Sequence, residues 1–223
     1  MVGKTAKTSW GGCKRCKKCN LKVAYIKYYL YLCTEFETIA MEFVRVISGY
    51  DHLWAVKDAS KQVDELTDLL RKWNNPDYLF DFFLDNLDDL QEFFHVERIS
   101  DAIEDTVDDA EQLQRLILEF PYTENLDEIF KPLGSSDMVI TELTREKARN
   151  WERTNHPSWL RVYAIRLDSN VYVITGGAIK LTRTMQEREH TTIELAKLNE
   201  CRQYLINNGV FDQDSFIGLM EED

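Results

Sequence analysis

The chain has 223 residues, of which 44% are hydrophobic and 30% are charged. A chain of this length can form one or two domains with a buried core, and its 9 Gly and 4 Pro exclude a collagen-like, linker-rich or wholly disordered protein. The formal net charge of −12 argues against a general nucleic-acid coat protein and against a membrane-surface protein.

Charge is distributed unevenly along the chain. The first 50 residues carry a net charge of +6, residues 51–140 carry −16, and residues 141–205 carry +3. Charge runs of this kind are usually the solvated faces of helices. A second interpretation is that the acidic block shields or mimics nucleic acid for a basic block, and the sequence leaves both interpretations open.

Three of the five cysteines lie close together near the N-terminus, at Cys13, Cys16 and Cys19. Gaps of two residues let two thiolates reach one zinc ion, but a structural zinc site needs a fourth ligand, for which Cys33 and His52 are the candidates. The alternative is a basic tail without a metal. We expect no cofactor in either case.

The most apolar stretch, residues 23–48, is interrupted by five charged residues, so it does not predict a membrane span. An odd number of cysteines predicts no disulfide framework, which is typical of a reducing compartment. We therefore expect a cytoplasmic protein with no membrane partner.

The N-terminal half predicts strands followed by helices. Residues 42–47 alternate apolar and polar side chains, and residues 53–56 can pair back on them as a hairpin. Helical spacing then predicts a helix after Ser60, one or two helices over residues 78–94, and another from Ser100 or Asp101 to Pro121. 

Two shorter segments follow. Residues 126–133 form a short apolar patch, and residues 141–151 are polar and predict a helix. In that helix the basic side chains are expected to pair with acids four residues away rather than to form an RNA track. These basic residues are Arg145, Lys147, Arg149 and Arg153, and the acids are Glu142 and Glu146.

The C-terminal third changes character. Residues 160–167 and 171–175 predict the two strands of a hairpin, and Gly176-Gly177 permits a bend before the strand continues over residues 178–181. A long helix is predicted over residues 187–207, and Asn208-Gly209 is its stop. 

Together these elements predict an α+β fold with N-terminal strands, a central helical region and a C-terminal antiparallel sheet with a closing helix. We divide the chain into a basic extension over residues 1–40, one domain over residues 41–208 with an acidic helical insertion around residues 60–120, and an acidic tail over residues 209–223. One hypothesis is that the native product begins at Met41, because the extension differs so much from the rest.

The predicted hairpin, Arg161–Arg166 with Val171–Thr182, resembles the RelE/HigB-like toxin superfamily. In that family an arginine-containing strand pairs with a strand that ends in a His-Gly-Phe-Ile-Lys-Lys-Thr type of motif. The matching segment here reads Gly-Gly-Ala-Ile-Lys-Leu-Thr over residues 176–182. Residues 126–133 are similar to the family's Leu-Phe-Lys-Lys-Leu stretch before the sheet, and the order of elements also fits a RelE-like fold.

The resemblance implies an endoribonuclease that cleaves mRNA, free or at the ribosome, with RNA or the ribosome and an antitoxin protein as partners. Such cleavage needs a base, an acid and cations that hold the phosphate. Arg161 and Lys180 match the family's basic strand residues by position, and Arg183 and His190 follow closely. These four are the candidate catalytic residues, with His190 able to exchange protons near neutral pH.

Two alternatives stay open. Arg161 and Lys180 can be ordinary outward-facing strand charges, and His190 can be a polar residue at a helix start. Leu181 and Thr175 stand where the family has a lysine and a histidine. The second hypothesis is therefore a non-catalytic relative, a RelE-fold binding protein of a phage or mobile element. No phosphate-binding loop, dinucleotide fingerprint, GxSxG or HExxH motif is present to suggest other chemistry.

Overall fold

The structure is a computed structural model that describes residues 41–119, 126–133, 143–150 and 156–222. The chain divides into two units, Met1–Ala40 and Met41–Asp223, and all described residues belong to the second. The cysteine cluster with Cys33, together with Glu142 and Arg153, lies outside the described residues, so the zinc hypothesis stays a prediction.

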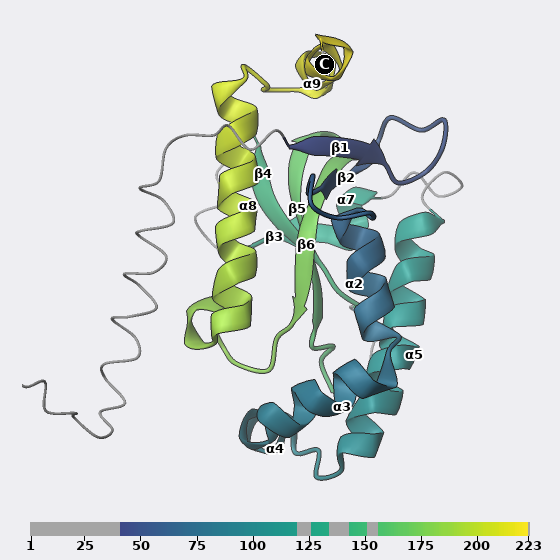
Figure 1. Cartoon of the computed structure of the whole chain (residues 1–223), viewed down its shortest axis with the longest axis vertical. Coiled ribbons are helices and arrows are strands. Elements are labelled where there is room, and N and C mark those ends of the chain that lie inside the picture. Colours follow the sequence, from purple (N-terminus) through teal and green to yellow (C-terminus); the bar gives the residue numbers. More distant parts are fainter. Residues whose placement is uncertain (1–40, 120–125, 134–142, 151–155, 223) are drawn as a thin grey trace, which may run out of the picture. The chain divides into compact units, whose positions relative to one another are not determined.

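The second unit is built on a six-stranded mixed sheet with strand order β1-β2-β6-β5-β4-β3 (Figure 1). All neighbouring strands are antiparallel except β2 and β6, which run parallel. The strands are β1 (Glu42–Arg45), β2 (Leu53–Lys57), β3 (Phe130–Pro132), β4 (Thr144–Ala148), β5 (Leu160–Asp168) and β6 (Val171–Ile179).

Helices cover both faces of this sheet, with α8 on one side and α2 and α5 on the other (Figure 1). The helices are α2 (Glu65–Trp73), α3 (Pro76–Asp85), α4 (Leu87–Phe94), α5 (Ile99–Leu118), α7 (Leu126–Ile129), the short 3-10 helix η2 (Met185–Glu187), α8 (Glu189–Asn207) and α9 (Gln213–Glu222). The α+β class is therefore confirmed.

The central strands bury side chains in two separate cores, because successive strand residues point to opposite faces. From β5, Val162 and Ala164 pack in the core under α2 and α5, whereas Tyr163 and Ile165 pack in the core under α8 and α9. Both sets are fully or almost fully buried. The sheet is thus a middle layer, and any polar residue on it must find a partner or reach an edge.

Most predicted elements are present. The first hairpin, the α5 helix, the β5–β6 hairpin and the α8 helix are confirmed, with α2 beginning after an Asp64 cap rather than near Ser60. Over residues 78–94 there are two helices, α3 and α4. The residue before α3, Asn75, accepts hydrogen bonds from the backbone N–H groups of Asp77 and Tyr78.

The predicted helix over residues 141–151 is wrong, because residues 144–148 form strand β4. Its alternation of basic and other residues follows the period of a strand: Glu146 and Ala148 are buried, while Arg145 and Lys147 are half-buried on the other face. Long-range pairing with β5 outweighs the helical preference of a polar segment. A strand does not bring side chains four residues apart together as a helix does, so β4 lacks the helical geometry on which the expected i,i+4 pairs depend.

The acidic tail also contains structure that the sequence did not predict. Helix α9 inserts the fully buried ring of Phe216 between Phe43 and Trp54, with ring centroids 5.3 and 5.2 Å away. Edge-to-face contacts of this kind tie the end of the chain to the first hairpin.

Candidate functional site

A bulge in β6 sets the geometry of the candidate site. Tyr163 of β5 lies opposite Gly176 and Ala164 lies opposite Ile174, so Thr175 is an extra residue in β6. Gly176 has a φ of +147°, and a Cβ there would lie 2.2 Å from Glu194 Oε2. A Cβ on Gly177 would lie 2.4 Å from the Arg161 carbonyl oxygen. Both positions therefore require glycine.

Side chains of helix α8 bond to the backbone of β6 beside this bulge. β2 pairs with β6 only as far as Ile174, and beyond that residue no strand in the described part of the chain pairs with this edge of β6. There Glu194 accepts a hydrogen bond from the Gly177 N–H (3.1 Å), and His190 Nε2 bonds the Ile179 carbonyl (2.9 Å). His190 and Glu194 are four residues apart and thus share one face of α8.

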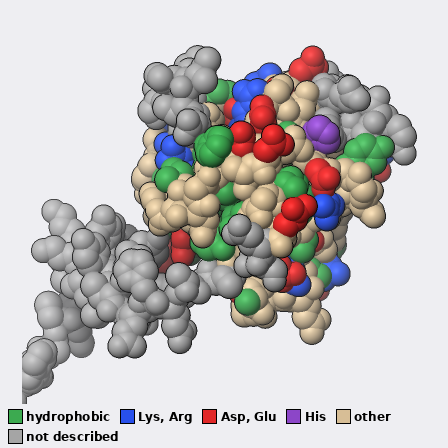
Figure 2. Space-filling view, turned by 90° about the horizontal axis from the view of Figure 1, so that it is seen from above, with side chains coloured by type: hydrophobic (Ala, Val, Ile, Leu, Met, Phe, Trp, Pro, Cys, Tyr) green, Lys and Arg blue, Asp and Glu red, His purple; other side chains and the backbone are tan. Residues whose placement is uncertain are grey.

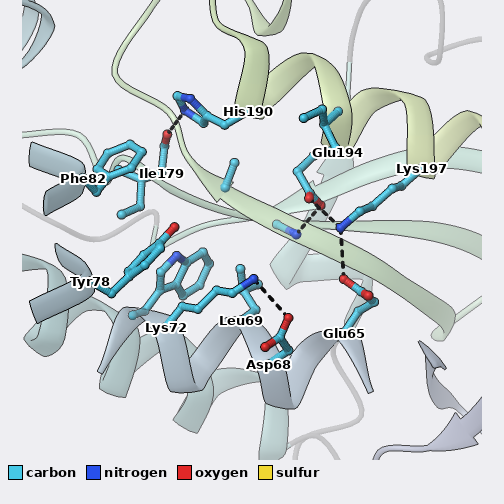
Figure 3. A pocket seen from close by; sticks show the side chains of 14 residues that line it. Glu65, Asp68, Leu69, Lys72, Tyr78, Phe82, Ile179, His190, Glu194 and Lys197 are labelled. Carbon is cyan, nitrogen blue, oxygen red and sulfur yellow. Dashed lines mark hydrogen bonds and ion pairs between the residues drawn. The ribbon is translucent and has the colours of Figure 1, made fainter. Parts of the chain in front are cut away.

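A pocket of about 190 Å³ lies at this edge, between α2, α3, α8 and β6 (Figure 3). Its apolar lining comes from α2, α3, β6 and α8, and its charged and polar side chains come from α2, Tyr78 of α3 and α8. The lining residues are Glu65, Asp68, Leu69, Lys72, Trp73, Tyr78, Phe82, Gly177, Ala178, Ile179, His190, Ile193, Glu194 and Lys197.

Opposite charges alternate along the pocket. Lys197 Nζ lies 2.8 Å from Glu194 and 3.2 Å from Glu65, and Lys61 joins Glu65 to Asp68 (Figure 3 shows the first two pairs). Burial raises the pKa of Glu194, and the ammonium of Lys197 offsets only part of that rise. Burial alone would lower the pKa of Lys197, but Glu194 and Glu65 together raise it.

The charges of nearby carboxylates also affect the pKa of the Tyr78 phenol. Burial raises its pKa, and the charges of Glu194 and Asp68 raise it further. The pocket is therefore electrostatically compensated by its own lysines, with a residual negative field near Tyr78.

A second group of charges lies on the α8 side of the sheet, and we call it the basic surface: Lys147, Arg149, Arg161 and Lys180. Arg161 pairs across the sheet with Ala178, two residues before Lys180, and Lys147 pairs with Tyr163. Here like charges adjoin one another. Figure 2, by contrast, shows acidic, basic and apolar side chains interspersed on the face seen from above.

Burial and this crowding lower the pKa values of the two sequence-predicted cations, Arg161 and Lys180. Burial lowers the pKa of Arg161 to about 10, and the neighbouring charge of Arg149 adds to that effect. Burial, followed by the charge of Arg161, lowers the pKa of Lys180. Each cation is held by backbone carbonyls: Arg161 Nη1 donates to Ser158 and Leu160, and Lys180 Nζ donates to Thr182 and Arg183.

The four sequence-predicted site residues thus fall into two places. Arg161 and Lys180 share the basic surface, and the exposed Arg183 adjoins it through its own carbonyl. His190 instead lines the pocket, which none of the other three residues lines. Its imidazole lies edge-on to Phe82, with centroids 5.2 Å apart.

Several residues of both places were not recognised in the sequence. Lys147 and Arg149 were assigned to a helix, although their alternate spacing was the available signal for a strand face. Glu65, Glu194 and Lys197 looked like ordinary helix-surface charges. Only the Gly176-Gly177 pair marked a close approach of some other group to the strand, without saying which group.

Comparisons with protein-family models, with curated proteins and with solved structures find no match to this chain. Among the helices that the structure describes, none is long and apolar enough to cross a lipid bilayer.

Proposed function

We propose that this protein binds RNA in the cytoplasm through its basic surface, as a relative of the RelE/HigB-like toxins. The supporting observation is that Arg161 and Lys180 lie on one side of the sheet, close enough for the charge of Arg161 to lower the pKa of Lys180. Adjacent cations repel each other, and the phosphates of a nucleic acid relieve that repulsion.

Binding is better supported than cleavage. Arg161 and Lys180 are oriented by carbonyl bonds and can hold phosphate oxygens, since each retains further N–H donors. The basic surface carries only lysine and arginine side chains, which are ordinarily protonated near neutral pH, and His190 is engaged at Ile179 on the pocket side. This distribution favours the non-catalytic form of the proposal, and an antitoxin partner stays a prediction.

Acids also act on this surface. The charge of the buried Asp109 opposes the lowering of the Arg161 pKa. The charge of Glu187 on η2 acts on Lys180 and opposes the lowering of its pKa. Glu187 is itself engaged, because its carboxylate accepts hydrogen bonds from the backbone N–H (2.6 Å) and hydroxyl (2.8 Å) of Thr184. It weakens the positive field at one end, so we expect moderate affinity with a strong dependence on salt.

The test is fluorescence anisotropy with a labelled single-stranded RNA over a series of salt concentrations. The double substitution Arg161→Gln/Lys180→Gln should weaken binding by about tenfold or more and make the salt slope shallower by about 1.4, the value for two lost phosphate contacts. The matched control is Arg71→Gln/Arg98→Gln, which removes two exposed cations elsewhere.

Equal losses in both double variants would contradict the proposal, because binding would then follow net charge alone. The same RNA, recovered after incubation in a translation extract, also reports cleavage. Cleavage by the wild type that disappears in Arg161→Gln/Lys180→Gln would assign the catalytic form to the basic surface.

A further inference from the structure

Helix α3 carries an exposed face that combines apolar and acidic side chains. Its other face is anchored by Leu79 and Phe83, which are fully buried in the core under α2 and α5. Outward, Phe80 and Leu84 are 49% and 52% exposed. Their spacing of four residues places them side by side on one stripe of the helix.

Aspartates border this stripe. Asp77, Asp81 and Asp85 follow one another at intervals of four residues and are all exposed, and Asp88 continues the series at the start of α4. We call Asp77, Phe80, Asp81, Leu84 and Asp85 the α3 face.

The carboxylates of the α3 face are not paired with a cation in the described part of the chain. Among the residues that the structure describes, no ion pair or side-chain hydrogen bond reaches the carboxylates of Asp77, Asp81 or Asp85. Like charges four residues apart destabilise a helix, and Asp85 lies in the last turn, where the helix dipole also disfavours an anion. Solubility alone explains the aspartates but not the two large apolar side chains among them.

We propose that the α3 face docks a basic amphipathic helix of a partner protein. Apolar side chains of such a helix, spaced three or four residues apart, cover Phe80 and Leu84, while its Lys and Arg residues pair with the flanking aspartates. A helix of 10 residues is about 15 Å long, so a partner segment of about ten to twelve residues spans it. A segment this short folds only when it docks.

The same charges disfavour other occupants. RNA and anionic lipid surfaces are repelled by three adjacent aspartates. A symmetric contact with a second copy would place these aspartates against themselves. Helix α3 packs on the core under α2 and α5 through its other face, whereas the basic surface lies on the α8 side, so this proposal does not depend on RNA binding.

The probe is a fluorescein-labelled 14-residue peptide of Leu and Lys, with Leu at three- and four-residue intervals, titrated with the full chain. A scrambled peptide of the same composition has the same charge without the apolar stripe. We expect micromolar binding of the amphipathic peptide and about tenfold weaker binding of the scrambled one.

Two variants divide the α3 face into its parts. Phe80→Ser/Leu84→Ser removes the apolar stripe and Asp81→Asn/Asp85→Asn removes the charge, and each should weaken binding at least about fivefold. The matched control is Glu104→Gln/Asp108→Asn, which removes two exposed carboxylates four residues apart on α5 and should change binding less than about twofold.

All substituted positions are exposed, and thermal unfolding checks that each variant is folded. Equal weakening of peptide binding by the α5 control would overturn the proposal, because binding would then depend on net charge alone. Unchanged binding in both α3 variants would overturn it as well. Sedimentation velocity covers the remaining occupant: self-association that is lost in Phe80→Ser/Leu84→Ser would assign the face to a second copy instead.

Discussion

The pocket and the basic surface lie beside the same two elements, β6 and α8, but they handle charge in opposite ways. In the pocket each carboxylate has a lysine partner, as Lys197 shows with Glu65 and Glu194. On the basic surface Arg161 and Lys180 adjoin other cations, and each donates its hydrogen bonds to neutral backbone carbonyls.

This difference separates stability from recognition. A compensated network at a strand edge positions α8 on the sheet, and losing a member leaves a partner with an unmet charge. Crowded like charges contribute little to stability and are useful mainly when an anion arrives. Substitutions around the pocket should therefore lower the free energy of unfolding more than substitutions of the basic surface do.

The largest effect is expected at the bulge on which both regions depend. Gly177→Ala would place a Cβ 2.5 Å from Leu69 Cδ2 and 2.4 Å from the Arg161 carbonyl oxygen. The strand must then shift away from α2, which should lower the free energy of unfolding by about 3 kcal/mol. Urea unfolding measures this change.

Gly218→Ala is the matched control, because nothing lies within 4 Å of a Cβ at that position in α9. Alanine is the better helix former, so this variant should gain about 0.5–1 kcal/mol. If Gly177→Ala were as stable as the wild type, the close approach of Leu69 to the bulge would be refuted.

The second-largest effect on stability is expected at Lys197 of the pocket. Lys197→Met keeps the apolar stem but removes the ammonium that pairs with two mostly buried carboxylates. We expect a loss of about 2 kcal/mol, below the 3–5 kcal/mol of a fully buried pair because Lys197 is 37% exposed. Adding Glu194→Gln should restore part of the loss, and a further decrease would contradict this account.

The fold was predictable from local patterns where one period dominates. Alternation identified β5 and β6, and helical spacing identified α5 and α8. The parallel pairing of β2 with β6 was not predictable, because it joins strands over one hundred residues apart. Strand β4 was missed for a similar reason: its polar sequence becomes a strand only when β5 is beside it.

The site was predictable in part. The resemblance to the RelE/HigB-like hairpin grouped Arg161 and Lys180, and the register of β5 with β6 places both on the same side of the sheet. His190 was grouped with them by closeness in sequence, yet the helix turns it toward Ile179 and the pocket. The pocket charges come from α2 and α8, and no local pattern joins Glu65 to Lys197 across 132 residues.

A smaller effect on stability is expected at the lysine of the basic surface. Lys180→Met, the same change as at Lys197, removes bonds to the Thr182 and Arg183 carbonyls but also removes a half-buried charge next to Arg161. The loss and the relief nearly cancel, so the free energy of unfolding should change by less than about 1 kcal/mol. RNA affinity should nevertheless fall. A destabilisation as large as that of Lys197→Met would remove the distinction between the two regions.

The smallest effect is the pH dependence of stability that comes from Glu194 in the pocket. Burial raises the folded-state pKa of Glu194 above 4.5, so the folded protein holds this proton more tightly than the unfolded chain. Stability from this group therefore increases as the pH falls from neutral through the raised pKa and becomes constant below 4.5.

Glu194→Gln cannot titrate, so the stability of the wild type relative to this variant should rise over the same window in urea unfolding at several pH values. A relative stability that stays constant or falls on acidification would show that Lys197, rather than burial, dominates the environment of Glu194.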